Sequence, residues 1–297
     1  MVLSVDLGQS GTRIRMGDNN ITSPRGKLSG EDPLTSLRIV FTSIEKLSAE
    51  TVALSCTGFN GVVPEPYNYL TLCAEFFSAK HVALIDDGLA GYFGALQGIN
   101  GVVLTLGGGV VSVGGKDGAF AHRDGLGSTF GDEGGGFWLG KLAITRALAF
   151  RQGRGIDDGL LEVFAKQVAA YDELEIKNAT DAATLAIKSA KLLLDAADAK
   201  IQSAIKIRNE GARLLADTVI ATWVGTGGSL SQSPQIAIHG GPSGNRNYAL
   251  AIESFVSQAI PNAKFIEALG DNLDGATWIG ENMLNDSTPL LRWAHEI

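Results

Sequence analysis

The earliest segment that could do chemistry runs from Asp6 to Arg13 and follows an apolar, strand-like run. Its first carboxylate could hold Mg²⁺ through water, because hard cations prefer oxygen ligands. Its two glycines let the backbone come close to an anion, and backbone N–H groups, with the hydroxyls of Ser10 and Thr12, could donate to phosphate oxygens. The segment suits a phosphate-binding turn, and it suits equally a plain hairpin in which the carboxylate bonds its own loop.

A pair of adjacent carboxylates, Asp86 and Asp87, closes a second apolar run that begins at His81. Aspartate is a common helix N-cap, so the local sequence favours a cap for the helix that follows. A carboxylate at the carboxyl edge of an open α/β sheet, where ligands bind, could instead act as a general base. The pair therefore predicts a helix N-cap, and a general base remains the alternative.

The most unusual stretch runs from Gly125 to Gly140 and encloses Asp132 and Glu133 between glycines. Glycines lose the most conformational entropy on ordering, so such a run is costly as mere structure. Placed just before a helix, the two carboxylates could bind sugar hydroxyls, with Phe137 or Trp138 packing beneath. A flexible surface loop is the alternative.

Two common nucleotide-binding signatures are excluded. Neither Gly26-Lys27 nor Gly115-Lys116 is framed as the glycine–lysine pair of a P-loop. The glycine run 107–109 has Ser112 where a dinucleotide-binding motif requires its last glycine. Taken alone, three glycines indicate a turn more often than a site.

The elements that must position these segments alternate between strand and helix. Strand-like runs end in Gly, Ser or Asp and lead into helical segments, which predicts an α/β architecture. The strand–glycine turn–strand pattern of residues 2–16 returns at 101–113 and suggests two related lobes. The expected strands are Val2–Asp6, Thr12–Met16, Val52–Ser55, His81–Ile85, Val102–Leu106, Val110–Val113 and Gln235–His239. The expected helices lie at 87–95, within 138–223 and at Tyr248–Ala259, before a tail rich in turn residues.

Composition and charge narrow the class of protein. The 297 residues are 45% apolar and 19% charged, which is typical of a well-packed soluble protein. A net charge of −8 argues against a nucleic-acid backbone as the main partner, since such proteins need a basic face. Cys56 and Cys73 form no CxxC pair, and the four histidines are scattered singly. A cytoplasmic protein without a signal sequence or a membrane span is expected.

Taken in order, these segments resemble the N-acetylglucosamine kinase branch of the BadF/BadG/BcrA/BcrD ATPase family, within the actin/hexokinase/Hsp70-like superfamily. Asp6–Thr12 looks like the first phosphate motif, and Asp86–Gly88 resembles the family's Asn-Asp-Ala. Leu106–Gly109 stands in the place of the second phosphate motif, Gly-Thr-Gly-Ser. Gly131–Gly134 matches the sugar-side Gly-Asp-Glu-Gly, the most specific of the set, and Ile238–Gly241 resembles the adenosine motif.

The resemblance implies a fold and an activity. The fold would be the two-lobed, actin-like ATPase fold (ribonuclease H-like, α/β), with the ligand cleft between the lobes. The lobes would be residues 1–98 with 281–297, and residues 99–280. The activity would be that of an ATP-dependent kinase that uses Mg²⁺ and phosphorylates an amino sugar, with N-acetylglucosamine at its 6-hydroxyl as the first expectation. Its partners would be the sugar and ATP, and the resemblance also allows a homodimer.

The resemblance also assigns roles to individual residues. Asp87 would be the catalytic base, and Asp6 would position Mg²⁺. The expected sugar-binding residues are Gly108, Gly131, Asp132 and Glu133. The expected nucleotide-binding residues are Gly8, Gln9, Ser10, Gly11, Thr12, Gly107, Gly109, Gly240 and Gly241.

The sequence departs from the family pattern at three places. Gly108 and Val110 replace the threonine and serine of the second phosphate motif, which removes two hydroxyls. Pro242 follows the adenosine glycines, and the segment 21–30 lacks the Asn-centred sugar contact. Two alternatives therefore stay open: a non-catalytic sugar or nucleotide sensor of the same fold, and an activator-type ATPase. The activator would carry an iron–sulfur cluster, for which the two cysteines do not stand in the expected positions.

Overall fold

The computed structural model describes residues 1–28, 30–172, 178–285 and 288–296. The chain packs as two units. Unit 1 comprises Met1–Val103, Val113–His122 and Glu267–Ile297, and unit 2 comprises Leu104–Ser112 and Arg123–Ile266. The predicted lobes, 1–98 with 281–297 and 99–280, include positions 286, 287 and 297, which lie outside the described residues. That division remains a prediction.

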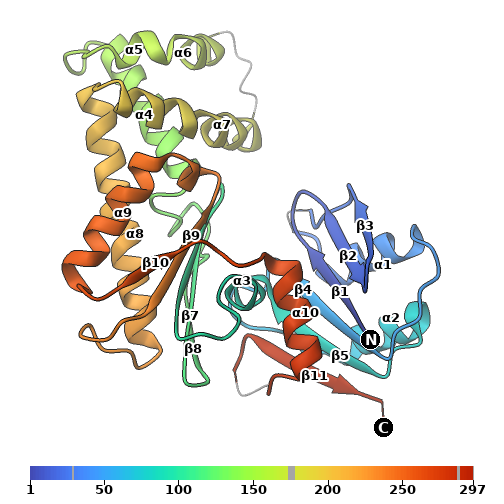
Figure 1. Cartoon of the computed structure of the whole chain (residues 1–297). Helices are drawn as coiled ribbons and strands as arrows, with labels where there is room; N and C mark the ends of the chain where they lie inside the picture. Colours follow the sequence, from blue (N-terminus) through green and yellow to red (C-terminus); the bar gives the residue numbers. More distant parts are fainter. Residues whose placement is uncertain (29, 173–177, 286–287, 297) are drawn as a thin grey trace. The chain divides into compact units, whose positions relative to one another are not determined.

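The centre of unit 1 is a six-stranded sheet (Figure 1). Its strands are β1 (Val2–Leu7), β2 (Thr12–Met16), β3 (Asn19–Ser23), β4 (Thr51–Cys56), β5 (His81–Asp86) and β11 (Leu291–His295), in the order β11-β5-β4-β1-β2-β3. β1 runs parallel to β4 and β4 runs parallel to β5, while β2, β3 and β11 are antiparallel to their neighbours. The carboxyl ends of β1, β4 and β5 therefore share one edge, where open α/β folds bind ligands.

Helices cover both faces of this sheet. They are α1 (Pro33–Thr42), α2 (Tyr67–Phe77), α3 (Asp87–Leu96) and α10 (Asn272–Asn282). Alternate side chains of a strand face opposite sides, so Leu3, Val5 and Leu7 are fully buried in a core with α1 and α2. Ser4 points to the other face, where its hydroxyl accepts a hydrogen bond of 2.8 Å from Thr277 of α10.

Helices α3 and α10 approach each other closely at glycines. A Cβ at Gly94 would lie 1.9 Å from the carbonyl oxygen of Asp271, and a Cβ at Gly275 would lie 1.8 Å from that of Ala90. Because both distances are far inside van der Waals contact, only glycine fits at these positions. The tail is rich in turn residues, but it also holds a helix that the sequence pattern did not predict: a capping box formed by Asp271 and Asp274 starts α10, and its glycines serve packing.

A second sheet has five strands. They are β6 (Gly101–Leu106), β7 (Val110–Lys116), β8 (Ala119–Asp124), β9 (Gln235–Gly240) and β10 (Lys264–Ile266), in the order β10-β9-β6-β7-β8. The helices of unit 2 are α4 (Gly136–Arg151), α5 (Leu160–Val163), α6 (Ala165–Asp172), α7 (Ala179–Asp198), α8 (Gln202–Gly225), the short 3₁₀ helix η1 (Pro242–Gly244) and α9 (Arg246–Ala259). All the predicted strands and helices are thereby confirmed where the structure describes them; positions 173–177, within the predicted helical stretch, lie outside that range.

Buried contacts join the helices of unit 2. A Cβ at Gly140 of α4 would lie 1.8 Å from the carbonyl oxygen of Ala186, so α4 and α7 pack backbone against backbone. Tyr248 of α9 is fully buried, and its hydroxyl donates to the carbonyl of Gly134 at 2.8 Å. This bond ties α9 to the loop that precedes α4.

Cys56 and Cys73 are both buried as free thiols in unit 1. Among the residues that the structure describes, no helix combines the length and the apolar character needed to span a bilayer.

Candidate active site

The turn between β1 and β2 is tight and supported from behind. The N–H of Gly8 donates to the carbonyl of Gly11 at 3.0 Å, and the N–H of Lys27 donates to the carbonyl of Gly8 at 2.9 Å. A Cβ at Gly26 would lie 2.5 Å from that same carbonyl oxygen, so the segment after β3 packs directly on the turn. The side chains exposed at its tip are Gln9 and Ser10.

Thr12 belongs to the support of this turn. Its side chain is fully buried at the start of β2, and its hydroxyl donates to the carbonyl of Arg25 at 2.7 Å. The hydroxyl therefore fixes the segment that lies behind the turn. A contact of Thr12 with a phosphate remains a prediction.

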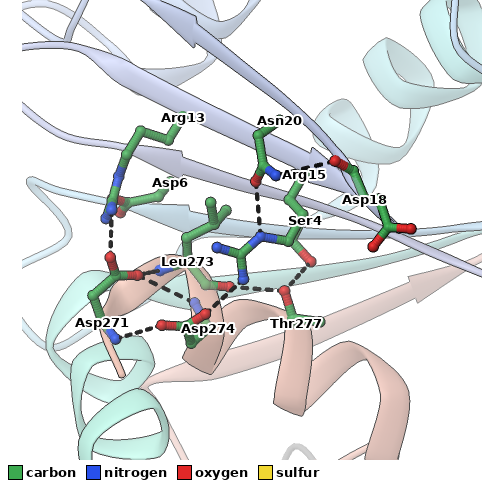
Figure 2. A network of polar contacts seen from close by, with 10 residues as sticks. All are labelled: Ser4, Asp6, Arg13, Arg15, Asp18, Asn20, Asp271, Leu273, Asp274 and Thr277. Atoms are coloured by element: carbon green, nitrogen blue, oxygen red, sulfur yellow. Dashed lines mark hydrogen bonds and ion pairs between the residues drawn. The ribbon is translucent and has the colours of Figure 1, made fainter. Parts of the chain in front are cut away.

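Asp6, at the carboxyl end of β1, lies in the network of charged groups that Figure 2 shows. Its Oδ2 accepts hydrogen bonds from Nη2 and Nε of Arg13 at 2.7 and 3.3 Å, and its Oδ1 accepts one of 3.2 Å from Ser55. A further ion pair joins Arg13 to Asp271. Partial burial opposes the charge of Arg13, but its bonds to the two carboxylates raise its pKa. Since Oδ1 has only one long hydrogen bond, it keeps capacity to accept from a ligand.

Asp86 closes β5 with both of its oxygens engaged. Oδ1 accepts the N–H of Gly88 at 3.0 Å, which makes Asp86 the N-cap of α3. Oδ2 accepts the N–H of Gly61 at 3.0 Å. The predicted cap is confirmed, and Asp86 is the residue that forms it.

Asp87 has a different environment, although it is the next residue. Desolvation by burial and the neighbouring charge of Asp86 raise the pKa of Asp87 to about 7, against the opposing effect of a hydrogen bond from Thr57. A carboxyl of this kind exchanges its proton near neutral pH, which is where a general base works best. A strongly shifted pKa at the ligand-binding edge of a sheet marks a functional-site candidate.

Lys27, to which the sequence patterns assigned no role, lies over Gly58 in the loop after β4. A Cβ at Gly58 would lie 2.7 Å from the Cε and 3.0 Å from the Nζ of Lys27, so glycine leaves the room that this side chain occupies. Gly58 follows Thr57, the residue that bonds Asp87. Lys27 is not among the main influences on the pKa of Asp87, which are burial, carboxylates and hydrogen bonds. Its ammonium therefore lies against the residue that follows Thr57, and it is not a counter-ion of Asp87.

His122 is a second residue near the base that the sequence did not single out. Its ring lies against Gly61, where a Cβ would be 3.2 Å from the ring, and its Nε2 is 3.9 Å from Oδ1 of Asp86. The side chain is only 13% exposed. The sequence did not indicate this position for His122, because the residues near its ring, Gly61 and Asp86, are many positions away in the chain.

In unit 2, the glycine turn after β6 is fastened to the start of α4. The carbonyl of Gly107 accepts the N–H of Gly136 at 2.9 Å, and the carbonyl of Gly108 accepts the N–H of Phe137 at 2.9 Å. The turn and the first residues of this helix therefore form one structural piece. Both had been predicted, separately, as ligand-binding segments.

The carboxylate of Asp132 supports the same turn. Its Oδ1 accepts the N–H of Val110 at 2.9 Å, and a Cβ at Gly109 would lie 2.8 Å from its Oδ2. Burial raises the pKa of Asp132, and the hydrogen bond from Val110 opposes that rise. Gly109 is thus needed to let this carboxylate approach the backbone. A sugar contact of Asp132 remains a prediction.

The neighbours of Asp132 differ in exposure. Its own N–H donates to Oδ1 of Asp124 at 2.9 Å, and a Cβ at Gly131 would lie 2.5 Å from the same oxygen. The loop is therefore shaped by two inward-facing aspartates. Glu133 is exposed, so it is the carboxylate of this loop that a ligand can reach.

Unit 2 also contains a cavity of about 650 Å³, a size typical of small-molecule sites. One wall is the apolar face of α7, which also carries an ion pair of 2.7 Å between Lys191 and Asp195. The opposite side is formed by the glycine turn after β6 and by the segment around η1. The lining residues are Gly107, Gly108, Gly136, Ile187, Ala190, Lys191, Leu194, Asp195, Gly241, Pro242, Gly244, Asn245 and Arg246.

Three of the predicted nucleotide- and sugar-binding glycines, Gly107, Gly108 and Gly241, line this cavity. Gly240 has a positive φ of 109°, and a Cβ there would lie 2.0 Å from the carbonyl oxygen of Leu106. Gly240 therefore allows β9 to lie close to β6, and Gly241 faces the cavity.

In unit 1, the structure brings the predicted Asp6 and Asp87 to one edge of the sheet, since the charge of Asp6 contributes to the raised pKa of Asp87. Among the described residues, no three His, Cys, Asp or Glu side chains gather closely enough to bind a metal ion by themselves. Magnesium held mainly by nucleotide phosphates needs only one or two carboxylates. Asp6, whose Oδ1 keeps capacity to accept from a ligand, is a carboxylate that fits a cation of this kind.

No protein-family model matches the sequence, and no curated protein matches it in sequence. Solved structures do match the chain. The fold resembles that of a candidate N-acetylglucosamine kinase from Chromobacterium violaceum, at 21% identity and a TM-score of 0.62, over 93% of this chain and 96% of that one. A candidate N-acetylglucosamine kinase from Porphyromonas gingivalis matches at 14% identity and a TM-score of 0.61, over 95% of this chain and 100% of that one.

A third structure comes from a different group of sugar kinases. It is a ROK family glucokinase from Streptomyces griseus, solved with glucose and AMPPNP, which matches at 15% identity and a TM-score of 0.55, over 95% of this chain and 99% of that one. The chain has the sugar-kinase fold. The predicted two-lobed, actin-like ATPase fold is thereby confirmed. At these identities the sugar-kinase fold is established and the substrate is not.

Proposed function

We propose that the chain is an ATP-dependent carbohydrate kinase that phosphorylates an amino sugar, with N-acetylglucosamine at its 6-hydroxyl as the first candidate. The observation that carries the proposal is Asp87, a carboxyl whose pKa is raised to about 7 at the edge where β1, β4 and β5 end. The proteins of similar fold support it, since two are named as candidate N-acetylglucosamine kinases and one is a glucokinase. Membership of the BadF/BadG/BcrA/BcrD family is part of the same proposal.

Asp87 would accept the proton of the acceptor hydroxyl. The hydroxyl oxygen forms a bond to the γ-phosphorus of ATP, the bond from that phosphorus to the bridging oxygen breaks, and ADP leaves with that oxygen. The hydroxyl proton passes to the Asp87 carboxylate, which must be ionised beforehand. With a pKa of about 7, the active fraction of Asp87 grows as the pH rises through neutrality.

Lys27 would meet the transferring phosphoryl group. Its backbone N–H is bonded to the β1–β2 turn, which is the proposed phosphate-binding turn, and its side chain lies over Gly58, next to Thr57 in the chain. Phosphoryl transfer depends on alignment and charge neutralisation more than on covalent catalysis. A cation whose backbone is held at the phosphate turn and whose side chain extends to the loop after β4 suits that requirement.

The remaining roles follow from which side chains are exposed and which residues line the cavity of unit 2. Asp6 would hold Mg²⁺, which neutralises phosphate charge when bound. The cavity of unit 2 would bind the nucleotide. Its apolar wall from α7 would lie against the adenine ring, and its glycines would lie at the phosphates. The exposed Glu133 would bind sugar hydroxyls, and Asp132 would hold the second phosphate turn in place.

Of the alternatives, the activator-type ATPase is disfavoured by its cysteines. Cys56 and Cys73 are both buried in the core of unit 1, so neither offers a thiolate for a cluster at the surface. The sensor is favoured by one observation, the absence of side-chain hydroxyls from the Gly107–Val110 turn. It differs from the kinase in predicting binding without turnover.

The test is ADP release from Mg·ATP in the presence of a panel of amino sugars and plain hexoses. We expect release that depends on one class of sugar and falls by roughly 10²–10⁴-fold in Asp87→Asn, because general-base catalysis contributes about that much. Asp18→Asn, which neutralises an exposed carboxylate between β2 and β3, serves as the matched control and should keep its activity.

Binding measurements complete this test. Asp87→Asn should still bind the sugar, since its side chain retains the size of aspartate. Sugar or ATP binding without release in the unaltered chain would establish the sensor. Turnover in Asp87→Asn close to that of the unaltered chain would remove Asp87 from the role of base.

A further inference from the structure

Two histidines that are 214 positions apart in the sequence face each other on the unit 1 sheet. His81 is the first residue of β5 and His295 is the last residue of β11, and they stand opposite each other in the antiparallel register. Their Nδ1 atoms are 3.0 Å apart, and both rings are at the surface. Figure 1 shows β11 alongside β5, with the C-terminus just beyond it.

The short contact has a definite chemical meaning. A neutral imidazole carries one N–H and one nitrogen lone pair. Two Nδ1 atoms at hydrogen-bond distance therefore share one proton that lies between them, with the N–H of one ring directed at the lone pair of the other. A metal ion at that place would use both lone pairs, with both rings neutral.

The separation of the two nitrogens also selects among metals. Bonds from a metal to imidazole nitrogen are about 2.0–2.1 Å long, so two such bonds at a right angle hold their nitrogens about 2.9 Å apart, and a tetrahedral angle holds them about 3.3 Å apart. The 3.0 Å observed between His81 and His295 is close to the right-angle value. Right angles occur in the tetragonal sites of Cu²⁺ and Ni²⁺, whereas Zn²⁺ would need the rings to open by a few tenths of an ångström.

We propose that His81 and His295 form a binding site for a late divalent transition-metal ion, with Ni²⁺ and Cu²⁺ fitting best as the structure stands. Two protein ligands leave other coordination positions to water or to a small ligand. A hollow of about 300 Å³ adjoins His295 and is also lined by Met283, Leu284, Asn285 and Trp293. Lys80, which precedes His81 in the chain, pairs with Glu50 at 3.5 Å, and this pairing offsets its repulsion of a cation.

This site is separate from the candidate active site. His81 begins β5 and Asp86 ends it, so the two are five residues apart, or about 17 Å at 3.3 Å per residue. The metal therefore cannot touch a substrate held by Asp87. The proposal stands independently of the kinase activity.

Trp293 provides a direct readout. Its ring lies parallel to that of His295, with 6° between the planes and 5.8 Å between the centroids, and its Nε1 donates to the carbonyl of Leu284 at 2.8 Å. Paramagnetic Cu²⁺ and Ni²⁺ quench the fluorescence of a nearby indole. Binding at His295 should therefore reduce the emission of Trp293.

The experiment is titration of the full chain with NiCl₂, followed by calorimetry and by tryptophan fluorescence. We expect one saturable site per chain, with Kd raised by at least about tenfold in His81→Ala and in His295→Ala, since loss of even an outer-shell partner of a metal ligand costs that much. His239→Gln, which removes a histidine elsewhere, should bind as the unaltered chain does. Trp293→Phe should lose most of the quenching and keep the heat of binding.

Two results would overturn the proposal: the absence of saturable binding, or binding that survives both histidine substitutions unchanged. Circular dichroism of each variant shows whether it is folded, and His295→Ala is the safer variant because it lies at an exposed strand end.

Discussion

The side chain of Ile187 on α7 occupies the space beside Gly108 in the second glycine turn: its Cδ1 would lie 2.8 Å from a Cβ at that position. In the family that the sequence resembles, a threonine stands there. Ile187 of α7 therefore occupies the space that a side chain at position 108 would need. Both residues line the cavity proposed for the nucleotide.

Gly108→Thr should consequently weaken nucleotide binding, and it should lower the free energy of unfolding by about 0.5 kcal/mol at most, because the Cδ1 that it meets ends a half-exposed side chain that can turn aside. The double variant Gly108→Thr with Ile187→Ala should recover most of both losses, because the smaller side chain vacates the space. Thermal unfolding and nucleotide titration of the four members of this cycle provide the measurement. If Gly108→Thr alone is as stable as the unaltered chain, Ile187 moves aside without cost.

Asp87 should make the stability of the fold depend on pH. Its folded pKa of about 7 lies above its ordinary value of 3.8, so the folded state binds the proton more tightly than the unfolded state. The contribution of Asp87 to the free energy of unfolding is fully present below pH about 4 and is lost as the pH rises to about 7. Asp87→Asn cannot ionise, so it should unfold at higher urea than the unaltered chain at pH 8, with a difference that shrinks toward pH 4. A difference that does not change with pH would contradict the raised pKa.

Lys27→Met should separate phosphate recognition from sugar recognition. We expect kcat to fall roughly 10²-fold or more, the cost of removing one preorganised group that stabilises transition-state charge. Lys27→Arg should retain part of the activity. Sugar binding, measured without nucleotide, should not change. A loss of sugar affinity with unchanged kcat would place Lys27 at the acceptor instead.

Asp271 has two functions that substitutions can separate. Its Oδ1 caps α10 by accepting the N–H groups of Leu273 and Asp274 at 2.9 and 3.3 Å, and its other oxygen pairs with Arg13. Asp271→Asn keeps a capping oxygen and removes the charge, so the free energy of unfolding should fall by less than about 1 kcal/mol, as for exposed ion pairs. Asp271→Ala removes the cap as well and should cost about 1 kcal/mol more. Equal losses in urea unfolding would show that the cap contributes nothing.

The sequence was most informative where chemistry-bearing residues stand at the ends of strands. Asp6 could be named because an apolar run followed by a carboxylate indicates a strand and its ligand-binding edge. For the pair Asp86 and Asp87 the local sequence favoured a helix cap, and only the family resemblance assigned the role of base to Asp87. The division of labour within the pair could not be predicted from the local sequence. It depends on the N–H of Gly61, which comes from another loop, and on burial that only the fold creates.

Other features were missed because their signals are not local. Lys27 lies against Gly58 and His122 lies against Gly61, and in both cases the glycine is many residues away in the sequence. Helix α10 was missed because its glycines lower helix propensity, while Gly275 allows its backbone to touch α3 and Gly280 lies against Val2 and Ala53 of the sheet. In each case the residue type is explained by a neighbour distant in the chain.

Unit 1 takes α10 and β11 from Glu267–Ile297, after the whole of unit 2 has been made. During synthesis the long segment Arg123–Ile266 can pack while β5 still lacks its neighbour β11 and α3 still lacks α10. An unpaired strand edge of this kind invites association with other chains. A nascent chain stalled at Ile266 would therefore present chaperones with an open sheet edge, which β11 closes once Leu291–His295 has been made.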